Sequence, residues 1–369
     1  MKTSDLLQVT AQSELGPAPI ASVSDAQIWK IAVTPMVKAL LGPLAAKGFS
    51  RFGDSTDGLF PGDEVSNLNS WSRNGVSKVV RFPYLATYYR TAHGAFIVKR
   101  DWLKIKAFAW FGDVLAGKPG ELIFSFGLRD RRFDGTPLAN DSALLDFPYD
   151  EPQNKPLIIR GRQLSGTSLE TSLYSFFPQT TIAKRVGDEV LNDFIAKPYT
   201  YSNRPKQFLR LLFTLWQSQT YPGQVGVPIF DVGKNAHAAF EKIATACGYD
   251  FLETAPSHLH VYGWNCAKGY ECSDPEHEAT INAFKAKVAE LARNGQSLTR
   301  VQESWLFVMQ SLGPDQTPER FYLGGLVWPQ NNIDQNNLWL HKPLSSRAKA
   351  QIKAIKKETE CNPQTSMPQ

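Results

Sequence analysis

Residues 274–314 read DPEHEATINAFKAKVAELARNGQSLTRVQESWLFVMQSLGP and predict two consecutive helices. Asp274 is a good N-cap with Pro275 at the first helical position, and the apolar residues that follow recur at helical spacing. An Asn-Gly pair ends this helix. Thr299 and Gln302 form a capping box for the next one, which a Gly-Pro pair stops. The later part of the chain is therefore expected to be rich in helix.

Strand signals are denser earlier in the chain. KVVRFPYLATYYRTA (78–92) and AFIVKR (95–100) flank a His-Gly turn, and ELIFSFGL (121–128) and KPLIIRGRQL (155–164) follow. Shorter strands are predicted later, at 224–232, 258–264 and 321–328. This order predicts an α+β fold, with a mixed or antiparallel sheet in the N-terminal half and a helix-rich C-terminal half.

The length of 369 residues predicts one large domain or two moderate ones. Composition shifts along the chain predict four segments: a flexible leader (1–24), a sheet-rich α+β domain (25–180), a helix-rich domain (181–341) and a basic polar tail (342–369). No period of 20 to 50 residues repeats, which argues against solenoids and propellers.

Composition is that of an ordinary globular protein, with 42% hydrophobic and 20% charged residues and a net charge of +5. The most apolar stretch (31–46) is interrupted by lysine and proline and is too short to cross a bilayer. Four cysteines are too few to staple a chain of this size. These features predict a cytoplasmic protein in a reducing compartment, with no membrane partner.

Five side chains that can bind metal crowd into SHLHVYGWNCAKGYECSDPEH (257–277), although the chain has only 4 cysteines and 6 histidines. They are His258, His260, Cys266, Cys272 and His277. Imidazole and thiolate are preferred zinc ligands, and a strand, a bend and a helix start could direct four of them at one ion. The C-x5-C spacing differs from the usual C-x2-C pair, so hydrogen-bonded histidines and free thiols without metal stay the alternative.

The HLHV element (258–261) resembles the metal-binding motif of the HUH endonucleases, which nick single-stranded DNA. The resemblance covers His258, His260 and their apolar neighbours. It implies that both histidines hold a divalent metal and that a tyrosine on a downstream helix attacks the phosphodiester. The downstream tyrosines lie in neither predicted helix, so the nucleophile is missing: Tyr262, Tyr270 and Tyr322.

Basic and aromatic residues alternate in the predicted sheet. The candidate phosphate contacts are Arg129, Arg131, Arg132, Arg160 and Arg162, and the candidate stacking residues are Tyr84, Tyr88 and Tyr89. Arginine offers a planar donor fork to phosphate, and aromatic rings on a sheet stack unpaired bases. Arg160 and Arg162 are expected on one face of a single strand. The alternative is a solvated face on which acidic residues pair with these arginines.

Several common enzyme signatures are missing. The chain contains no Walker-type phosphate loop, no dinucleotide-binding glycine motif after a strand, no nucleophile elbow and no HExxH helix. Their absence argues against common NTPases, dinucleotide enzymes and serine hydrolases.

The sequence favours a protein that binds single-stranded DNA or RNA without chemistry of its own, with zinc as a possible structural cofactor. One alternative is a metal-dependent hydrolase or nuclease centred on His258 and His260. Another is a structural or assembly subunit of a protein complex, favoured by the aromatic content.

Overall fold

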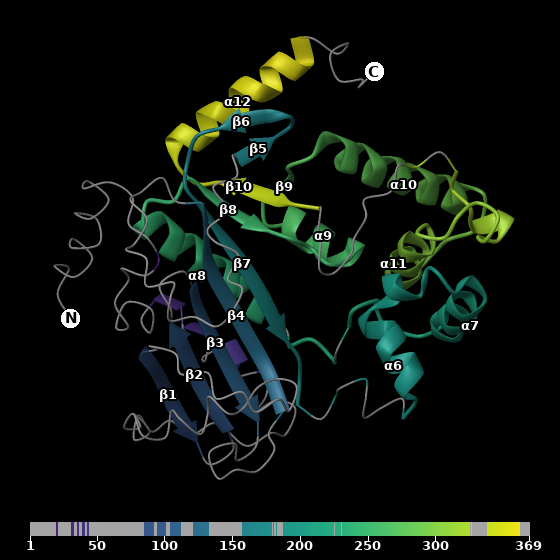
Figure 1. The fold of residues 1–369 in the computed structure, drawn as a ribbon, viewed down its shortest axis with the longest axis horizontal. Coiled ribbons are helices and arrows are strands. Elements are labelled where there is room, and N and C mark those ends of the chain that lie inside the picture. The colour runs from purple at the N-terminus through teal and green to yellow at the C-terminus, as the bar shows by residue number, and fades with distance from the viewer. Residues whose placement is uncertain are drawn as a thin grey trace.

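Most strands in the described part of the chain are gathered in one mixed sheet (Figure 1). This computed structural model describes residues 85–91, 94–100, 104–111, 121–132 and most of 157–361, with single positions between 20 and 43. The gaps within 157–361 are 179, 181, 183–186, 225, 230, 325 and 327–337. Across these described ranges the sheet has eight strands, in the order β1-β2-β3-β4-β7-β8-β10-β9.

The sheet strands are β1 (Leu85–Thr91), β2 (Gly94–Arg100), β3 (Lys104–Phe111), β4 (Glu121–Arg132), β7 (Ser168–Ser175), β8 (Phe251–Thr254), β9 (Glu271–Cys272) and β10 (Leu340–Pro343). A separate hairpin consists of β5 (Leu157–Ile159) and β6 (Arg162–Leu164). The helices described here are α6 (Glu189–Ala196), η5 (Pro198–Tyr201), α7 (Pro205–Leu215), α8 (Val232–Ala246), α9 (Leu259–Cys266), α10 (Pro275–Arg293), α11 (Arg300–Met309), η6 (Glu319–Phe321) and α12 (Ser346–Cys361). None of these helices has the length and apolar character needed to cross a membrane.

The sheet is mixed because of a single parallel pair. From β1 to β7 each strand is antiparallel to its neighbour, whereas β8 runs parallel to β7. A parallel pair needs a long crossover, and α6, α7 and α8 lie in that connection. β10 then lies between β8 and β9, antiparallel to both. The predicted α+β class is confirmed, but strands and helices interleave rather than divide into halves.

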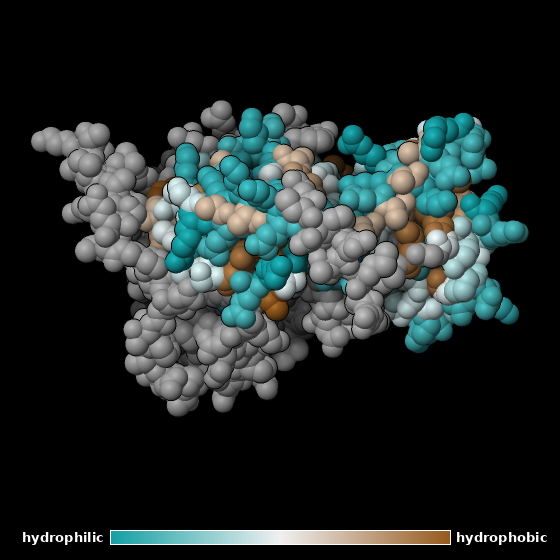
Figure 2. All heavy atoms as spheres, turned by 90° about the horizontal axis from the view of Figure 1, so that it is seen from above, coloured by the Kyte–Doolittle hydropathy of each residue, from teal (hydrophilic) through white to brown (hydrophobic). Residues whose placement is uncertain are grey.

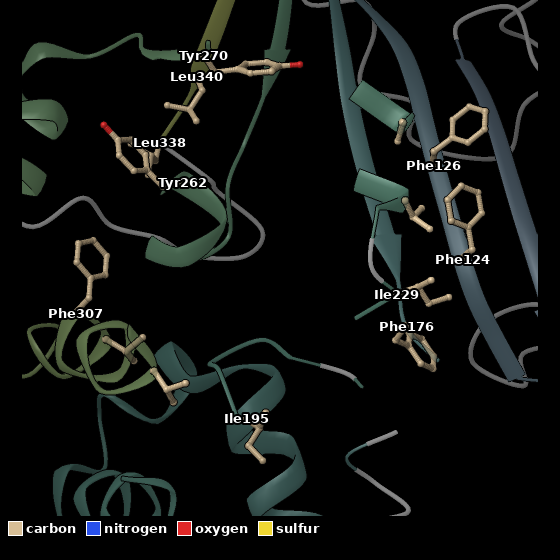
Figure 3. Close-up of a cluster of buried hydrophobic side chains, with 14 of the residues drawn as sticks. Phe124, Phe126, Phe176, Ile195, Ile229, Tyr262, Tyr270, Phe307, Leu338 and Leu340 are labelled. Carbon is tan, nitrogen blue, oxygen red and sulfur yellow. The ribbon is translucent and has the colours of Figure 1, made fainter. Parts of the chain in front are cut away.

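On β4 one face of the sheet is buried and the other is partly exposed. Phe126 packs against Phe240 of α8 with ring centroids 5.7 Å apart. Phe124 and Phe126 lie in the buried cluster (Figure 3), together with Leu128. The alternating positions between them are only partly buried. Alternation with a period of two is what places one set in the core and the other toward solvent.

Helices α6, α7 and α11 share one aromatic core. Phe194 of α6 stacks on Trp305 of α11 at 5.4 Å and meets Phe208 of α7 edge-on at 5.3 Å. The two predicted consecutive helices are confirmed as α10 and α11. Asp274 accepts hydrogen bonds from the first turn of α10, and the capping box at Thr299 is formed.

Three of the predicted strands take other conformations. The 258–264 segment begins helix α9, and the described residues of the 224–232 segment lie outside any strand. In the 321–328 segment Phe321 ends the 3-10 helix η6, and its other described residues are not in a strand. Short apolar runs cannot be assigned to strand or helix by periodicity alone, which accounts for these errors.

The segment predicted as a basic tail from 342 forms the end of β10 and the helix α12. Ala348, Ile352 and Ile355 are buried, and the first two pack with Phe251 and the β5–β6 hairpin. Their spacing along the helix places them on one face. Figure 2 views the molecule from the side on which α12 lies, and the described surface there is mostly hydrophilic.

The buried carboxylate of Asp250 joins three distant segments. It accepts hydrogen bonds from the Thr167 backbone N–H (3.0 Å), the Ser345 hydroxyl (2.5 Å) and the Arg347 guanidinium. Burial alone would raise the pKa of Asp250, but these donors outweigh it and hold that pKa below the ordinary value of 3.8. The ionised form therefore stabilises the fold.

We expect Asp250→Asn to lower the free energy of unfolding at pH 7 by roughly 1.5–3 kcal/mol, because charge-assisted hydrogen bonds are lost. A depressed carboxyl pKa gives stability that is present above the ordinary value of 3.8 and is lost as the pH falls through the lowered native pKa. The difference between the wild type and the variant should therefore shrink below pH 3.8. Urea unfolding across a pH series measures it.

The control is Asp315→Asn at an exposed carboxylate, which should change stability by less than about 0.5 kcal/mol. An Asp250→Asn variant as stable as wild type at pH 7 would contradict the assigned role of this carboxylate.

Candidate nucleic-acid interface and histidine pair

The HLHV element lies at the start of a helix rather than on a strand. His258 is the N-cap residue of α9, with extended backbone angles, and His260 is in the first turn. This corrects the predicted strand. The two histidines therefore do not lie on a strand, and in this respect the segment differs from the strand element on which the resemblance to HUH endonucleases was based.

Neighbouring side chains fix the orientation of the His258 imidazole. It is 2% exposed, its Nδ1 is hydrogen-bonded to the Ser257 hydroxyl at 2.9 Å, and its ring lies 5.8 Å from that of Tyr199. Burial, together with nearby His260, lowers the pKa of His258 to about 3. Its Nε2 is buried and has no hydrogen-bond partner among the described residues.

His260 lies beside His258 with ring centroids 5.8 Å apart. It also contacts Tyr221 at 4.5 Å and, edge-on, the half-exposed Trp264 at 5.1 Å. Burial lowers the pKa of His260 to about 4, so both imidazoles are neutral at pH 7. In the described part of the chain, the buried Nδ1 of His260 makes no hydrogen bond.

The other three predicted ligands have separate surroundings. Cys266 is hydrogen-bonded to Tyr262, and the Cys272 thiol donates to the Asp274 carbonyl at 3.3 Å. Burial raises the pKa of Cys272 to about 12, which keeps this thiol protonated. His277 lies in the first turn of α10. Nowhere in the described ranges do three His, Cys, Asp or Glu side chains come together as ligands of one ion.

The predicted arginines are not gathered at one place. Arg160 and Gly161 form the turn of the β5–β6 hairpin with positive φ angles of 52° and 70°, so the chain reverses before Arg162. The expectation that both arginines share one face of a single strand is therefore wrong. Arg160 forms an ion pair with Glu278 at 2.6 Å, and Arg162 pairs with Glu358 at 3.3 Å.

The arginines of β4 differ in their surroundings. Arg131 lies at a register shift, 3.5 Å from the Glu253 carboxylate and stacked over the Trp339 ring at 3.2 Å. Glu253 also accepts a hydrogen bond from Ser168. Arg129 is partly exposed, and Arg132 is the register partner of Ser168 at the end of the strand. Arg131 is thus largely occupied by contacts within the chain.

The predicted stacking tyrosines lie on or near the edge strand β1. Tyr84 lies outside the described residues. Tyr88 and Tyr89 are neighbours in β1, paired in register with Ile97 and Phe96 of β2. The register continues from Ile97 through Phe108 and Ser125 to Tyr174 on β7. The described members of this row, Phe108, Ser125 and Tyr174, are partly exposed.

Cationic residues are register partners across β2, β3 and β4. Lys99 is the register partner of Lys106, and Lys104 is the register partner of Arg129. Register partners share one face of a sheet, and Lys106 also pairs with Gly127, on the same partly exposed face as Arg129. We call Lys99, Lys104, Lys106 and Arg129 the cationic face. On β7 the register partner of Arg129 is the acidic Glu170.

The row of Arg129 continues through Glu170 into buried residues. From Arg129 the register runs to Glu170, Glu253, His341 and then Glu271. Glu253 is buried and lies 3.5 Å from Arg131, and Glu271 forms an ion pair with Lys356 at 2.7 Å. His341 is fully buried, and burial lowers its pKa to about 4, so it adds no positive charge at pH 7. The cationic face therefore does not continue beyond Glu170.

The amino-acid sequence alone did not identify the three lysines of the cationic face. Lys104 and Lys106 alternate on β3, which is a visible signal, but the identity of their cross-strand partners depends on the register. A bulge between Ala109 and Trp110 shifts that register further along the strand. Local sequence does not encode which residues will lie opposite one another.

Gly223 provides a test of how tightly His258 is held. Its φ is +72°, and a Cβ there would lie 2.3 Å from His258 Cε1. We expect Gly223→Ala to destabilise the protein by roughly 2–5 kcal/mol, combining the left-handed backbone with a clash against a fixed ring. Thermal and urea unfolding measure the loss.

Gly295→Ala is the matched control, because φ is +85° there and no atom lies within 4 Å of the added Cβ. Gly295→Ala should lower the free energy of unfolding only by the cost of a Cβ in the left-handed backbone conformation, roughly 1–2 kcal/mol. Equal losses of unfolding free energy in the two variants would show that the imidazole of His258 moves to accommodate the added Cβ. That result would contradict the tight packing described above.

Comparison with known proteins gives no family for this chain. No family model, curated protein or solved structure matches it. Its function has to be inferred from its own residues, register and contacts.

Proposed function

We propose that the protein binds single-stranded nucleic acid on the partly exposed face of its sheet, across β1 to β4 and β7. The observation that carries this proposal is the pairing of like charges, Lys99 with Lys106 and Lys104 with Arg129. Two such pairs on adjacent rows concentrate positive charge on one face of the sheet, which favours a polyanion whose phosphates would release counterions.

The neighbouring row supports a single strand rather than a duplex. It holds Tyr88, Phe108 and Tyr174 at register positions on one face. Aromatic rings on a sheet stack unpaired bases, while neighbouring cations contact the backbone. A duplex keeps its bases stacked on one another and offers them to no such ring.

The width of the partly exposed face limits the length of the bound strand. Beyond Glu170 the row continues into Glu253 and His341, which are buried and present no surface to phosphate. Strands lie about 4.8 Å apart, so β1 to β4 and β7 together span about 19 Å. The site should therefore hold roughly four nucleotides, at the lower end of the range for sheet-based binders.

We expect labelled dT12 and rU12 to bind with an affinity that falls as salt rises, because phosphate contacts release counterions. Arg129→Gln should weaken binding several-fold and flatten the salt dependence by about 0.7 in the log–log slope. The double variant Lys104→Gln/Lys106→Gln should lose about twice that slope. Fluorescence anisotropy over a salt series measures both quantities.

Lys353→Gln is the charge-matched control, since Lys353 is exposed on α12 and lies away from the cationic face. It should leave affinity and slope nearly unchanged. If Lys353→Gln and Arg129→Gln weaken binding equally, the affinity depends on the net charge of the protein and not on the cationic face. Absence of binding at low salt would overturn the proposal.

Tyr174→Leu separates stacking from charge. Tyr174 is partly exposed and meets Phe176 edge-on at 5.0 Å, which leaves the ring in a defined orientation. We expect a loss of about 1–3 kcal/mol in binding free energy with an unchanged salt slope. Tyr322→Leu, at an exposed tyrosine beside η6, is the matched control. A changed salt slope in Tyr174→Leu would mean that the substitution disturbs the cationic face through the fold instead of removing a stacking contact.

A further inference from the structure

We propose that the surface where α7 meets η6 docks an acidic segment of a partner protein, whose apolar side chains contact Phe213 and Tyr322. These two aromatic side chains are 38% and 42% exposed. A single exposed apolar residue is ordinary, but here further aromatic rings adjoin them, so the surface is a contiguous apolar patch. We call Phe213, Trp216, Phe321 and Tyr322 the α7–η6 patch. This inference stands independently of the nucleic-acid proposal.

The rings of the α7–η6 patch hold one another in position. The centroid of Phe321 lies 5.1 Å from that of Trp216 and 6.2 Å from that of Phe213. Two side chains of α11 anchor the backbone beneath the rings, because Gln302 donates to the Trp216 carbonyl at 3.2 Å and Gln310 donates to the Phe321 carbonyl at 2.9 Å. A partner would therefore meet side chains that are already ordered, which lowers the entropy cost of binding.

The exposed face of α7 beside the patch is basic. Lys206, Arg210 and Phe213 are exposed and recur at helical spacing, so they share one face of the helix. α7 itself contains no acidic residue. Within the described residues neither Lys206 nor Arg210 forms an ion pair. Both charges are therefore available to the carboxylates of a partner.

The 3-10 helix η6 adds a third cation. The Arg320 guanidinium lies over the Phe321 ring, 4.6 Å from its centroid, and among the described residues it too forms no ion pair. Glu319 is the acidic residue of η6. Across α7 and η6 three cations thus outnumber one carboxylate, and charge complementarity selects an acidic partner.

The packing of the rings favours a protein segment over nucleic acid. A base stacks on a free, flat ring face. Here the neighbouring rings are tilted against one another by 40° to 59°, Phe321 is buried, and Arg320 covers one of its faces. Apolar side chains fill the spaces between tilted rings, while Asp and Glu pair with the surrounding cations. Aromatic and arginine side chains also dominate the binding energy of protein interfaces.

The α7–η6 patch is remote from the cationic face. In Figure 1, α7 lies at the outer end of the helical part, on the opposite side of the molecule from β1. A partner on α7 would therefore leave the sheet open. The protein would hold a nucleic acid and an acidic protein segment at the same time.

The test is selection from a phage-displayed library of random peptides of about 15 residues on the purified full chain, followed by fluorescence anisotropy with the selected peptides. We expect these peptides to combine Asp and Glu with an aromatic or leucine side chain, and to bind more weakly as salt rises. Phe213→Ala should weaken binding at least about tenfold, because it removes the apolar contact. Arg210→Glu should weaken it at least about tenfold at low salt and less at high salt.

Trp264→Ala and Lys349→Glu are the matched controls, an exposed tryptophan on α9 and an exposed lysine on α12. Both should bind the selected peptides like wild type, and circular dichroism and thermal unfolding establish that each variant is folded. Failure to select any peptide, selected peptides that are not acidic, or binding unaffected by Phe213→Ala would overturn the proposal.

Two other occupants of the surface are tested with the same variants. If sedimentation shows a dimer of the chain that Phe213→Ala dissociates, the surface binds a second copy and the proposal is wrong. If Phe213→Ala weakens binding of labelled dT12, the surface belongs to nucleic acid, which would overturn the proposal too. We expect neither result, and the nucleic-acid proposal for the sheet is judged separately by Arg129→Gln.

Discussion

The carboxylate of Asp250 is the contact on which the arrangement of the sheet depends. It binds Thr167 just before β7 and Ser345 and Arg347 at the start of α12, while Asp250 itself precedes β8. These bonds bring together three segments that are far apart in the chain. They hold β10 beside β8, and the register of β10 in turn aligns His341 with two glutamates. That alignment places the buried Glu253 and His341 in the row that runs from Arg129, which limits the width of the proposed binding face.

The cationic face and the histidine pair arise by different physical means. The cationic face is a consequence of register, because its four residues come from three strands and become neighbours only through cross-strand pairing. The histidine pair is local, two residues apart at the start of α9, and Tyr199 of η5 and Gly223 pack against His258. Interactions of exposed charges are sensitive to salt. Burial instead lowers the pKa of both histidines and keeps the pair neutral at pH 7.

Local signals predicted local structure well. The caps at Asp274 and Thr299 and the helical spacing after them identified α10 and α11, because capping and periodicity act within a few residues. The hairpin at Arg160 escaped notice because only Gly161 signals it and arginine rarely takes a positive φ. The cationic pairs could not be predicted, since register is settled by partners far away in the chain. The crowding of histidine and cysteine near residue 260 predicted a shared metal centre, but within the described residues no three such side chains come together.

The position of β10 has a consequence for how the chain is made. β8 and β9 emerge from the ribosome well before the strand that lies between them, with α9, α10 and α11 synthesised in the interval. Until that strand arrives, the nascent chain carries an open strand edge on β8, a known template for unwanted pairing with other chains. Completion of the sheet therefore waits until β10 has been synthesised, and slow translation between β9 and β10 would prolong the vulnerable interval.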